Sequence, residues 1–169
     1  KVGGALYFSL VSRPDVSFAV GVLTRFMSCA GALHMKAIDR VISYLFSIRN
    51  FGVQLRRGCS RTVPLAFSSR PTSGGGNAKS DVDPLSKDPY NYADADFAGD
   101  VGTRRSTNGG CTLLHGGVVS WLSKLQPTVA LSTAEAETNA AVEAVKSIVH
   151  TRLLMRELGR GPSGPTELY

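Results

Sequence analysis

The sequence contains no long hydrophobic run and few cysteines, and these absences exclude several classes of protein. Its longest apolar stretch, Val16 to Leu23, is far too short to cross a bilayer, which argues against a membrane protein. The first residues lack the basic region and cleavage site of a secretory signal. The cysteines are odd in number and lack C-x-x-C spacing, so we expect reduced thiols in an intracellular, non-secreted protein rather than a disulfide framework or a zinc site. They are Cys29, Cys59 and Cys111.

Acidic residues are also scarce in the first third of the chain. Residues 1–61 contain nine Lys or Arg against two Asp, a net charge of +7, whereas residues 62–169 carry a net charge of −1. This asymmetry favours a basic part that binds a polyanion and a second part that carries the chemistry. Ordinary solvated charge is the alternative. The chain starts at Lys1 rather than Met, so we expect a segment of a longer polypeptide.

Hydrophobic periodicity predicts an α/β (α+β) protein in three parts. Residues 1–67 form a basic segment with helical patterns in 16–27 and 34–48 and a possible hairpin over 51–68. Residues 68–89 are rich in Gly, Ser, Pro and Asp, which is typical of a linker. Residues 90–169 read β-β-β-α-β, with turns expected at 108–110 and 116–117. The helix is expected from Thr133 to Leu158, with Ser132 and Glu135 as its capping box and Gly159 closing it.

The stretch YADADFAGD, residues 92–100, carries more carboxylates than a strand normally does. Asp94 and Asp96 would share one face of that strand. On the following helix, Glu137 is in line with three apolar residues, Ala141, Ala144 and Ile148, so we expect it to face the sheet and meet Asp94. A partly exposed glutamate near a helix N-terminus is the alternative for Glu137.

Clustered carboxylates repel one another unless a divalent cation lies between them. Oxygen ligands of this kind suit Mg²⁺ or Mn²⁺, and a two-metal site can cleave phosphodiesters. A calcium loop of the EF-hand type counted from Asp94 would need Asp or Asn at Ala98 and Glu at Arg105, so that reading fails. An aspartyl-phosphate phosphatase also has a D-x-D motif, but the strongly apolar strand that should precede it is absent.

Six stretches together resemble the pol polyprotein of copia-type long-terminal-repeat retrotransposons. They are SRPDVSFAVGVLTRFM, HMKAIDRVISYL, YADADFAGD, RRSTNGG, VVSWLSKLQPTVALSTAEAE and LLMRELG. The resemblance implies that the helical part is the thumb or connection behind a reverse transcriptase palm, which would be its upstream partner. It implies that the part from about residue 90 is a ribonuclease H-like domain, which cleaves RNA in RNA–DNA hybrids. The polyprotein context implies a cytoplasmic, virus-like particle or nuclear location and no membrane partner.

The same resemblance assigns roles to individual residues. Asp94 matches the first-strand metal-binding aspartate and Glu137 the helix glutamate, so these two would be catalytic and would hold Mg²⁺ or Mn²⁺. Asp96 and Asp100 lie in the same motif and are supporting candidates for metal or water. Three basic residues could contact hybrid phosphates, namely Arg104, Arg105 and Lys124. For the two arginines, a surface turn that binds no ligand is the alternative. Trp121 is expected in the core of the third strand rather than as a base-stacking platform.

The sequence departs from the family pattern at three places. Phe97 replaces a usual tryptophan, and Thr138-Asn139 replaces an aromatic–aliphatic pair. The family's next metal-binding aspartate would follow the strand begun by TELY, where the chain ends at Tyr169. We therefore expect little or no hydrolysis by the isolated chain. The alternatives are a non-catalytic nucleic-acid-binding remnant and the product of a degenerate element with no selected function.

Overall fold

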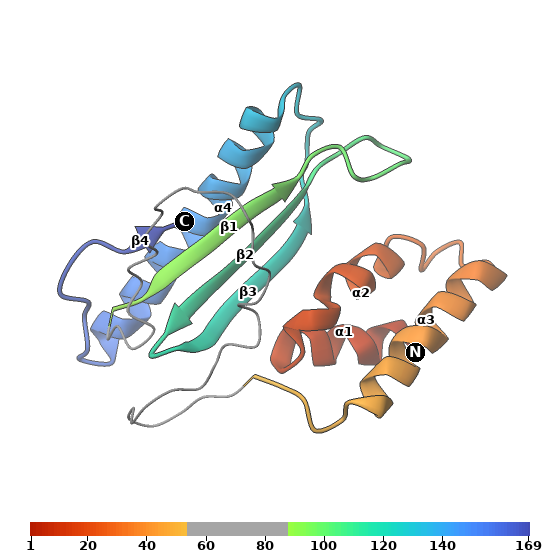
Figure 1. Ribbon diagram of the computed structural model, residues 1–169, viewed down its shortest axis with the longest axis horizontal. Coiled ribbons are helices and arrows are strands. Elements are labelled where there is room, and N and C mark those ends of the chain that lie inside the picture. Colours follow the sequence, from red (N-terminus) through yellow and green to blue (C-terminus); the bar gives the residue numbers. More distant parts are fainter. Residues whose placement is uncertain (54–87) are drawn as a thin grey trace, which may run out of the picture.

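The structure is a computed structural model that describes residues 1–53 and 88–169. A group of helices precedes a sheet, and one long helix connects the third and fourth strands of that sheet (Figure 1). The elements are α1 (Val2–Val11), η1 (Pro14–Val16), α2 (Ser17–Thr24), α3 (Ala32–Ser47), β1 (Tyr90–Asp96), β2 (Thr107–Leu114), β3 (Gly117–Leu125), α4 (Thr133–Glu157) and β4 (Glu167–Leu168). This order confirms the predicted mixed α/β class and the β-β-β-α-β sequence of elements.

Two predictions fall largely on residues 54–87, which lie outside the described residues. They are the hairpin over 51–68 and the linker over 68–89. The division of the chain into residues 1–67, 68–89 and 90–169 therefore stays a prediction.

The sheet has the strand order β3-β2-β1-β4. The three longer strands are antiparallel to one another, and the short β4 pairs in parallel with the start of β1. The turn predicted at residues 108–110 is wrong, because Asn108, Gly109 and Gly110 lie inside β2. The two glycines serve close packing instead: Gly109 is paired with Asp94, and a Cβ on Gly110 would lie 3.3 Å from the carbonyl oxygen of Tyr92.

Helix α4 packs on β1 and β2 through a stripe of buried residues at helical spacing. The stripe consists of Ala136, Ala140, Ala144, Ile148, Thr151 and Met155. The expectation that Glu137 heads this stripe is therefore wrong. The stripe starts one residue earlier, at Ala136, and the helical turn of about 100° per residue rotates Glu137 out to solvent.

Both ends of α4 are capped as predicted, except that the Glu135 side chain bonds to Leu131 instead of to the N-cap residue Ser132. The Ser132 hydroxyl accepts a hydrogen bond from the N–H of Glu135 at 3.1 Å, as in a capping box. The Glu135 carboxylate accepts from the N–H of Leu131 at 2.8 Å, one residue before the N-cap. At the other end, Gly159 adopts a φ of 69°, a conformation that glycine takes easily and that ends helices.

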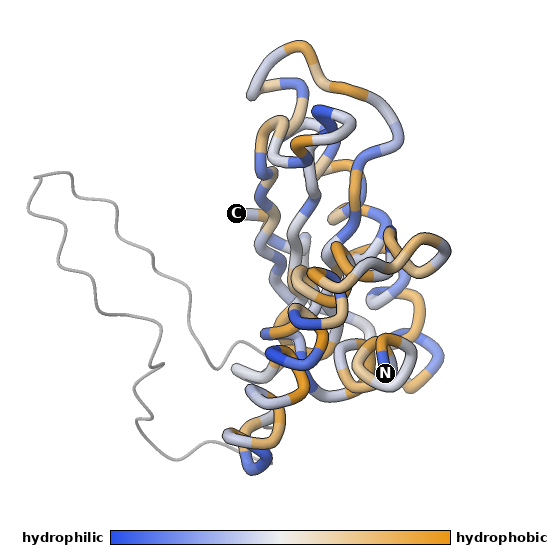
Figure 2. Tube along the Cα trace, turned by 90° about the vertical axis from the view of Figure 1, so that its right-hand side faces the viewer, coloured by the Kyte–Doolittle hydropathy of each residue, from blue (hydrophilic) through white to orange (hydrophobic). Residues whose placement is uncertain are grey.

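Helices α1, α2 and α3 form a second, smaller core beside the sheet. Its buried apolar residues are Ala5, Val16, Val20, Leu23 and Ile38. Figure 2 turns this side of the molecule toward the viewer and shows hydrophobic and hydrophilic residues interleaved along the helices. Pro14 starts the 3₁₀ turn that precedes α2, as its fixed φ and missing N–H favour. None of the helices in the described part of the chain combines the length and apolarity needed to span a membrane.

Candidate functional site

The two faces of β1 carry different chemistry. The Asn91 side chain points toward α4, since its amide donates to the Thr112 hydroxyl at 2.6 Å and that hydroxyl lies 3.2 Å from the hydroxyl of Ser147 in α4. Side chains alternate along a strand, so Asp94 and Asp96 project from the opposite face. Both aspartates are exposed. The predicted sharing of one strand face by these two carboxylates is confirmed.

An open hollow of about 610 Å³ covers this second face of the sheet, between the strands and the start of α2. Asp94 lies in its wall, and the residue opposite on β2 is Gly109, which has no side chain to cover the carboxylate. The Oδ1 atom of Asp94 accepts from the N–H of the next residue, Ala95, at 2.9 Å. The lining contains no Lys or Arg among the described residues, so its charged members are all carboxylates: Asp15, Asp94 and Asp96.

Asp96 is positioned by the turn that follows β1. Its carboxylate lies directly over Gly99, where an added Cβ would be 1.8 Å from Oδ2 and 2.5 Å from Cγ. A glycine at this position is thus required for the observed carboxylate orientation. The turn is held further by the Ser106 hydroxyl, which accepts from the N–H of Ala98 at 3.0 Å.

Asp100, the other supporting candidate, is held by contacts of its own. Its carboxylate pairs with the Arg25 guanidinium at 2.8 Å and accepts hydrogen bonds from the hydroxyl and the N–H of Thr103. The hydrogen bond from the Thr103 hydroxyl is the main reason that the pKa of Asp100 lies below its ordinary value. Because Arg25 directly follows α2, Asp100 joins the β1–β2 loop to the helical part of the chain.

Glu137 lies on α4, in the layer that covers the face of the sheet opposite Asp94. It is exposed. The start of α4 is near the Asp96 end of β1, because Gln126, just after β3, donates to the carbonyl of Ala136 at 2.9 Å. The structure therefore brings Glu137 to the correct end of the sheet but places it and Asp94 on opposite sides. Over residues 1–53 and 88–169, no three His, Cys, Asp or Glu side chains come together as a metal ion would require.

The three candidate nucleic-acid-binding residues lie near that same end of the sheet. Arg104 is exposed and has a φ of 57°, and Arg105 beside it is half-buried, both on the loop between β1 and β2. Lys124, near the end of β3, is paired with Glu143 of α4 at 3.6 Å. Glu143 also pairs with Lys146 at 2.5 Å, and this contact is the first cause of its lowered pKa.

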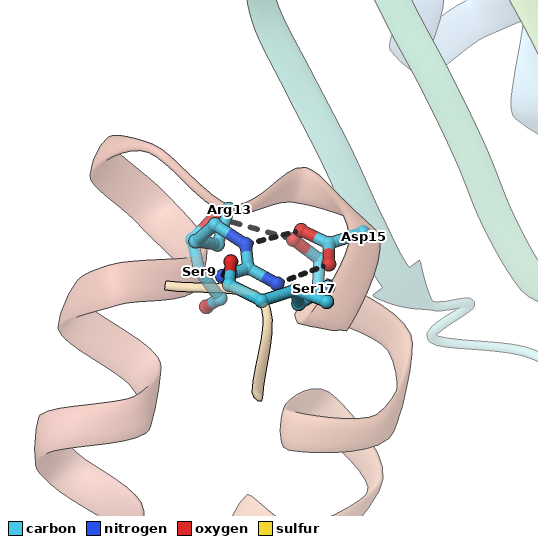
Figure 3. A network of polar contacts seen from close by, with 5 residues as sticks. Ser9, Arg13, Asp15 and Ser17 are labelled. Atoms are coloured by element: carbon cyan, nitrogen blue, oxygen red, sulfur yellow. Dashed lines mark hydrogen bonds and ion pairs between the residues drawn. The ribbon is translucent and has the colours of Figure 1, made fainter. Parts of the chain in front are cut away.

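Sequence reasoning missed a partly buried ion pair in the helical part, in which Arg13 is buried and Asp15 is partly exposed. Arg13 donates from Nε and Nη2 to the Asp15 carboxylate at 2.9 and 2.7 Å, and from Nη1 to the Ile48 carbonyl at 3.3 Å (Figure 3). Its guanidinium also lies 5.5 Å from the ring centre of Tyr44 and 5.6 Å from that of Phe51, within range for cation–π attraction. The Arg-Pro-Asp run could have indicated this pair, because Pro14 bends the chain between an arginine and an aspartate.

Trp121 was also missed as a contact between the two parts. Its indole N–H donates to the carbonyl of Ser9 in α1 at 2.7 Å. The same carbonyl accepts from the Ser17 hydroxyl at 3.2 Å, and both serines lie beside the Arg13–Asp15 pair in Figure 3. The tryptophan therefore attaches β3 to the helical part. Neither residue spacing nor hydrophobic pattern could have indicated a bond between residues so distant in sequence.

These contacts change the interpretation of the basic N-terminal charge. Three of the cations in residues 1–53 are paired with carboxylates: Lys1 with Asp39, Arg13 with Asp15 and Arg25 with Asp100. The other three are exposed: Lys36, Arg40 and Arg49. Within residues 1–53, three of the six Lys and Arg side chains are therefore unpaired and available to a polyanion.

Comparison with known proteins gives three informative relatives. The chain is 40% identical to the secreted RxLR effector protein 161 of Plasmopara viticola over 148 residues, 88% of this chain and 86% of that protein. Over 94% of this chain, it is 35% identical to the retrovirus-related Pol polyprotein from transposon TNT 1-94 of Nicotiana tabacum. Over 98% of this chain, it is 30% identical to the retrovirus-related Pol polyprotein from transposon RE1 of Arabidopsis thaliana. The chain spans 10% of each of these two polyproteins.

Two further comparisons are negative. No family model matches the chain, and no solved structure matches it.

Proposed function

We propose that this chain joins the end of a reverse transcriptase to an incomplete ribonuclease H-type domain. The chain is a retrotransposon Pol fragment and belongs to the same family as effector protein 161 and the retrovirus-related Pol polyproteins of transposons. The activity of the intact domain would be hydrolysis of RNA in an RNA–DNA hybrid. Its partners would be that hybrid and the upstream polymerase palm. Its location would be intracellular, in a virus-like particle or the nucleus.

The observation that carries this proposal is the pair of exposed aspartates in a hollow to which residues 1–53 and 88–169 contribute no Lys or Arg. Asp94 and Asp96 project into the hollow from one strand face, and Gly109 leaves Asp94 uncovered. A phosphate would be repelled from this lining, whose charged groups in the described part of the chain are all carboxylates. A divalent cation removes this repulsion by binding carboxylate and phosphate oxygens together. The site thus suits a metal-dependent reaction on a phosphodiester better than simple phosphate binding.

The donor set fits Mg²⁺ or Mn²⁺ in chemistry but is incomplete in number. Asp94 would hold the cation, with Asp96 as a second oxygen donor or a base for its bound water. When bound, such a cation supplies an activated water and stabilises the leaving oxygen. Glu137 could join only if the start of α4 moved around the edge of β1. We therefore propose that the isolated chain binds the cation weakly and does not cleave.

Cleavage of a labelled RNA–DNA hybrid tests the proposal directly. The purified chain with Mg²⁺ or Mn²⁺ should leave the hybrid intact. A fusion that continues it with the segment following the matched region in the tobacco polyprotein should cleave the RNA strand. Asp94→Asn should abolish that cleavage, whereas Asp39→Asn, on the exposed surface of α3, should leave it unchanged. Cleavage by the unextended chain that is lost in Asp94→Asn would refute the proposed inactivity. A fusion that folds but never cleaves would refute the ribonuclease H assignment.

A second candidate is a nucleic-acid-binding segment without catalysis, supported by the exposed Lys36 and Arg40. These residues are one helical turn apart on α3 and exposed, so they could contact successive phosphates. Phosphate binding weakens steeply with salt. Hybrid binding that falls as salt rises, is reduced by Lys36→Gln with Arg40→Gln, and persists in Asp94→Asn would favour this function. Binding that requires Mg²⁺ and Asp94 would favour the metal-dependent site.

A further inference from the structure

Helix α4 carries a second apolar stripe on the side turned away from the sheet. Four side chains form it, each about half exposed: Val142 at 50%, Val145 at 47%, Val149 at 50% and Leu153 at 50%. Their spacing of three or four residues places them on one line along the helix. The sheet already covers the stripe from Ala136 to Met155, so α4 is apolar on two opposite sides. A solvent-facing stripe of this length is typical of a helix that packs on another helix.

Opposite charges stand at the two ends of the outer stripe. Glu135 is in line with it at the N-terminal end and Arg156 at the C-terminal end, and both are exposed. Two pairs of residues are symmetric about a point between Val145 and Lys146, whereas the counterpart of Val145 is Lys146 and that of Leu153 is Thr138. Val142 and Val149 are equally far from that point, and so are Glu135 and Arg156. The stripe is therefore complementary to a copy of itself that runs in the opposite direction.

We propose that α4 pairs with α4 of a second copy of this chain, antiparallel and related by a two-fold axis near Val145. Val142 of one copy then packs against Val149 of the other, and Glu135 lies beside Arg156 at both ends. Such an interface is isologous, so it closes at two copies. Charges that flank an apolar helix seam select the partner and its orientation.

The neighbouring charges are compatible with this pairing. Lys146, next to the axis, is neutralised within its own chain by Glu143 at 2.5 Å. Arg152, next to the stripe, donates to the Gly164 carbonyl at 2.7 Å and to the Thr166 hydroxyl at 2.8 Å, which keeps it on its own chain. A parallel pair would place Glu135 beside Glu135 and Arg156 beside Arg156, and like charges in contact disfavour that orientation.

The size of the stripe predicts a weak dimer. A helix of 25 residues is about 37 Å long, so a seam about 10 Å wide covers roughly 400 Å² on each copy. Stable dimers bury about 800 Å² on each partner, and smaller interfaces belong to transient encounters. We therefore expect dissociation in the micromolar range or weaker.

Sedimentation of the full chain over a range of concentrations tests the proposal. The wild type should convert from monomer to dimer as concentration rises. Val145→Glu should remain a monomer throughout, while Leu33→Glu, which adds the same charge at an exposed apolar position of α3, should dimerise as the wild type does. Circular dichroism of each variant checks that the helices are retained. A wild type that stays monomeric at millimolar concentration, or a dimer that survives Val145→Glu, would overturn the proposal.

A charge exchange tests the antiparallel orientation. Arg156→Glu should weaken the dimer at least tenfold by placing two glutamates together at each end. Adding Glu135→Arg should restore it, because the exchanged pair is again opposite in charge. Glu135 also accepts a bond from the N–H of Leu131, so helix content is compared between the single and double variants. If the double variant retains its helix and is no stronger a dimer than Arg156→Glu, the antiparallel pairing of Glu135 with Arg156 is refuted. Binding of the stripe to anionic vesicles in place of dimer formation would also refute it.

Discussion

The helical part and the sheet part of the molecule are both organised around buried polar groups, but of opposite kinds. In the helical part the centre is an ion pair, Arg13 with Asp15, which are 6% and 21% exposed. In the sheet part it is a neutral amide: Gln126 donates to Oδ1 of Asn108 at 2.5 Å and to the carbonyl of Ala136. A second neutral contact joins Asn91 to Thr112.

This difference determines how much each part tolerates an imperfect contact. The neutral network includes a buried acceptor, Oδ1 of Asn91, for which the described part of the chain provides no hydrogen-bond partner. An unpaired amide oxygen costs only a few kcal/mol when buried, whereas a buried charge that loses its partner costs more. The charged centre accordingly has every side-chain nitrogen of Arg13 bonded. We expect the helical part to be the more sensitive of the two to loss of a single side chain.

Removal of Arg13 should give the largest effect. Arg13→Ala leaves the Asp15 carboxylate without its cation, removes a donor from the Ile48 carbonyl and opens a gap beside Tyr44 and Phe51. We expect the free energy of unfolding to fall by about 3 kcal/mol, because the ion pair, the hydrogen bond to Ile48 and the packing of the buried Arg13 side chain are lost together. Urea denaturation measures it, with Arg40→Ala on the exposed face of α3 as the control. A fall no larger than that of the control would contradict the central role of the ion pair.

Removal of the neutral centre should cost less. Gln126→Leu keeps most of the side-chain volume but leaves the Ala136 carbonyl and the Asn108 side chain without the amide. We expect a loss of about 2 kcal/mol. Thr128→Ala, two residues along the chain and exposed, is the control in the same denaturation measurement. If Gln126→Leu destabilises the chain more than Arg13→Ala, the proposed contrast between charged and neutral centres is wrong.

The sequence predicted the regular elements well because their signals are local. Ser132 and Gly159 mark the ends of α4 through the bonds and backbone angles of one turn. The turn expected at 116–117 was also close, but it lies one residue earlier, at His115–Gly116, and Gly117 already begins β3. Asn108 to Gly110 was read as a turn for the same local reason, and that failed because the glycines serve the contact with the neighbouring strand.

The candidate site was less predictable because it depends on how layers are stacked. Strand alternation correctly put Asp94 and Asp96 on one face, but it does not say which face the helix covers. The position of Glu137 depended on a rotation of about one residue around α4, which apolar spacing alone does not resolve when Ala136 and Ala141 are both small. The Trp121 bond to Ser9 depends on docking between distant segments, for which the sequence contains no periodic signal.

The contact between the two parts should be weaker than either centre. Trp121→Phe removes the indole donor to the Ser9 carbonyl and keeps an aromatic ring in β3. The carbonyl retains the Ser17 hydroxyl, so we expect a loss of about 1 kcal/mol, the net worth of one hydrogen bond. Amide hydrogen exchange should show faster exchange in α1 and unchanged exchange in the β1–β2 pair. If Trp121→Phe lowered the free energy of unfolding as much as Gln126→Leu does, the contact between the two parts would be as important to stability as the centre of the sheet part.

The smallest expected effect is a difference in acid sensitivity. The hydrogen bond from Arg13 is the main reason that the pKa of Asp15 lies below its ordinary value of 3.8. A lowered pKa in the folded state adds stability that is complete above the ordinary value and is lost as the pH falls through the folded value. Asp15→Asn should therefore flatten the decline of unfolding free energy between about pH 5 and pH 2. Gln126→Leu, which removes no charge, should lower that free energy by the same amount at each pH. Parallel curves for the wild type and Asp15→Asn would show that the charged centre of the helical part is no more acid-sensitive than the neutral centre of the sheet.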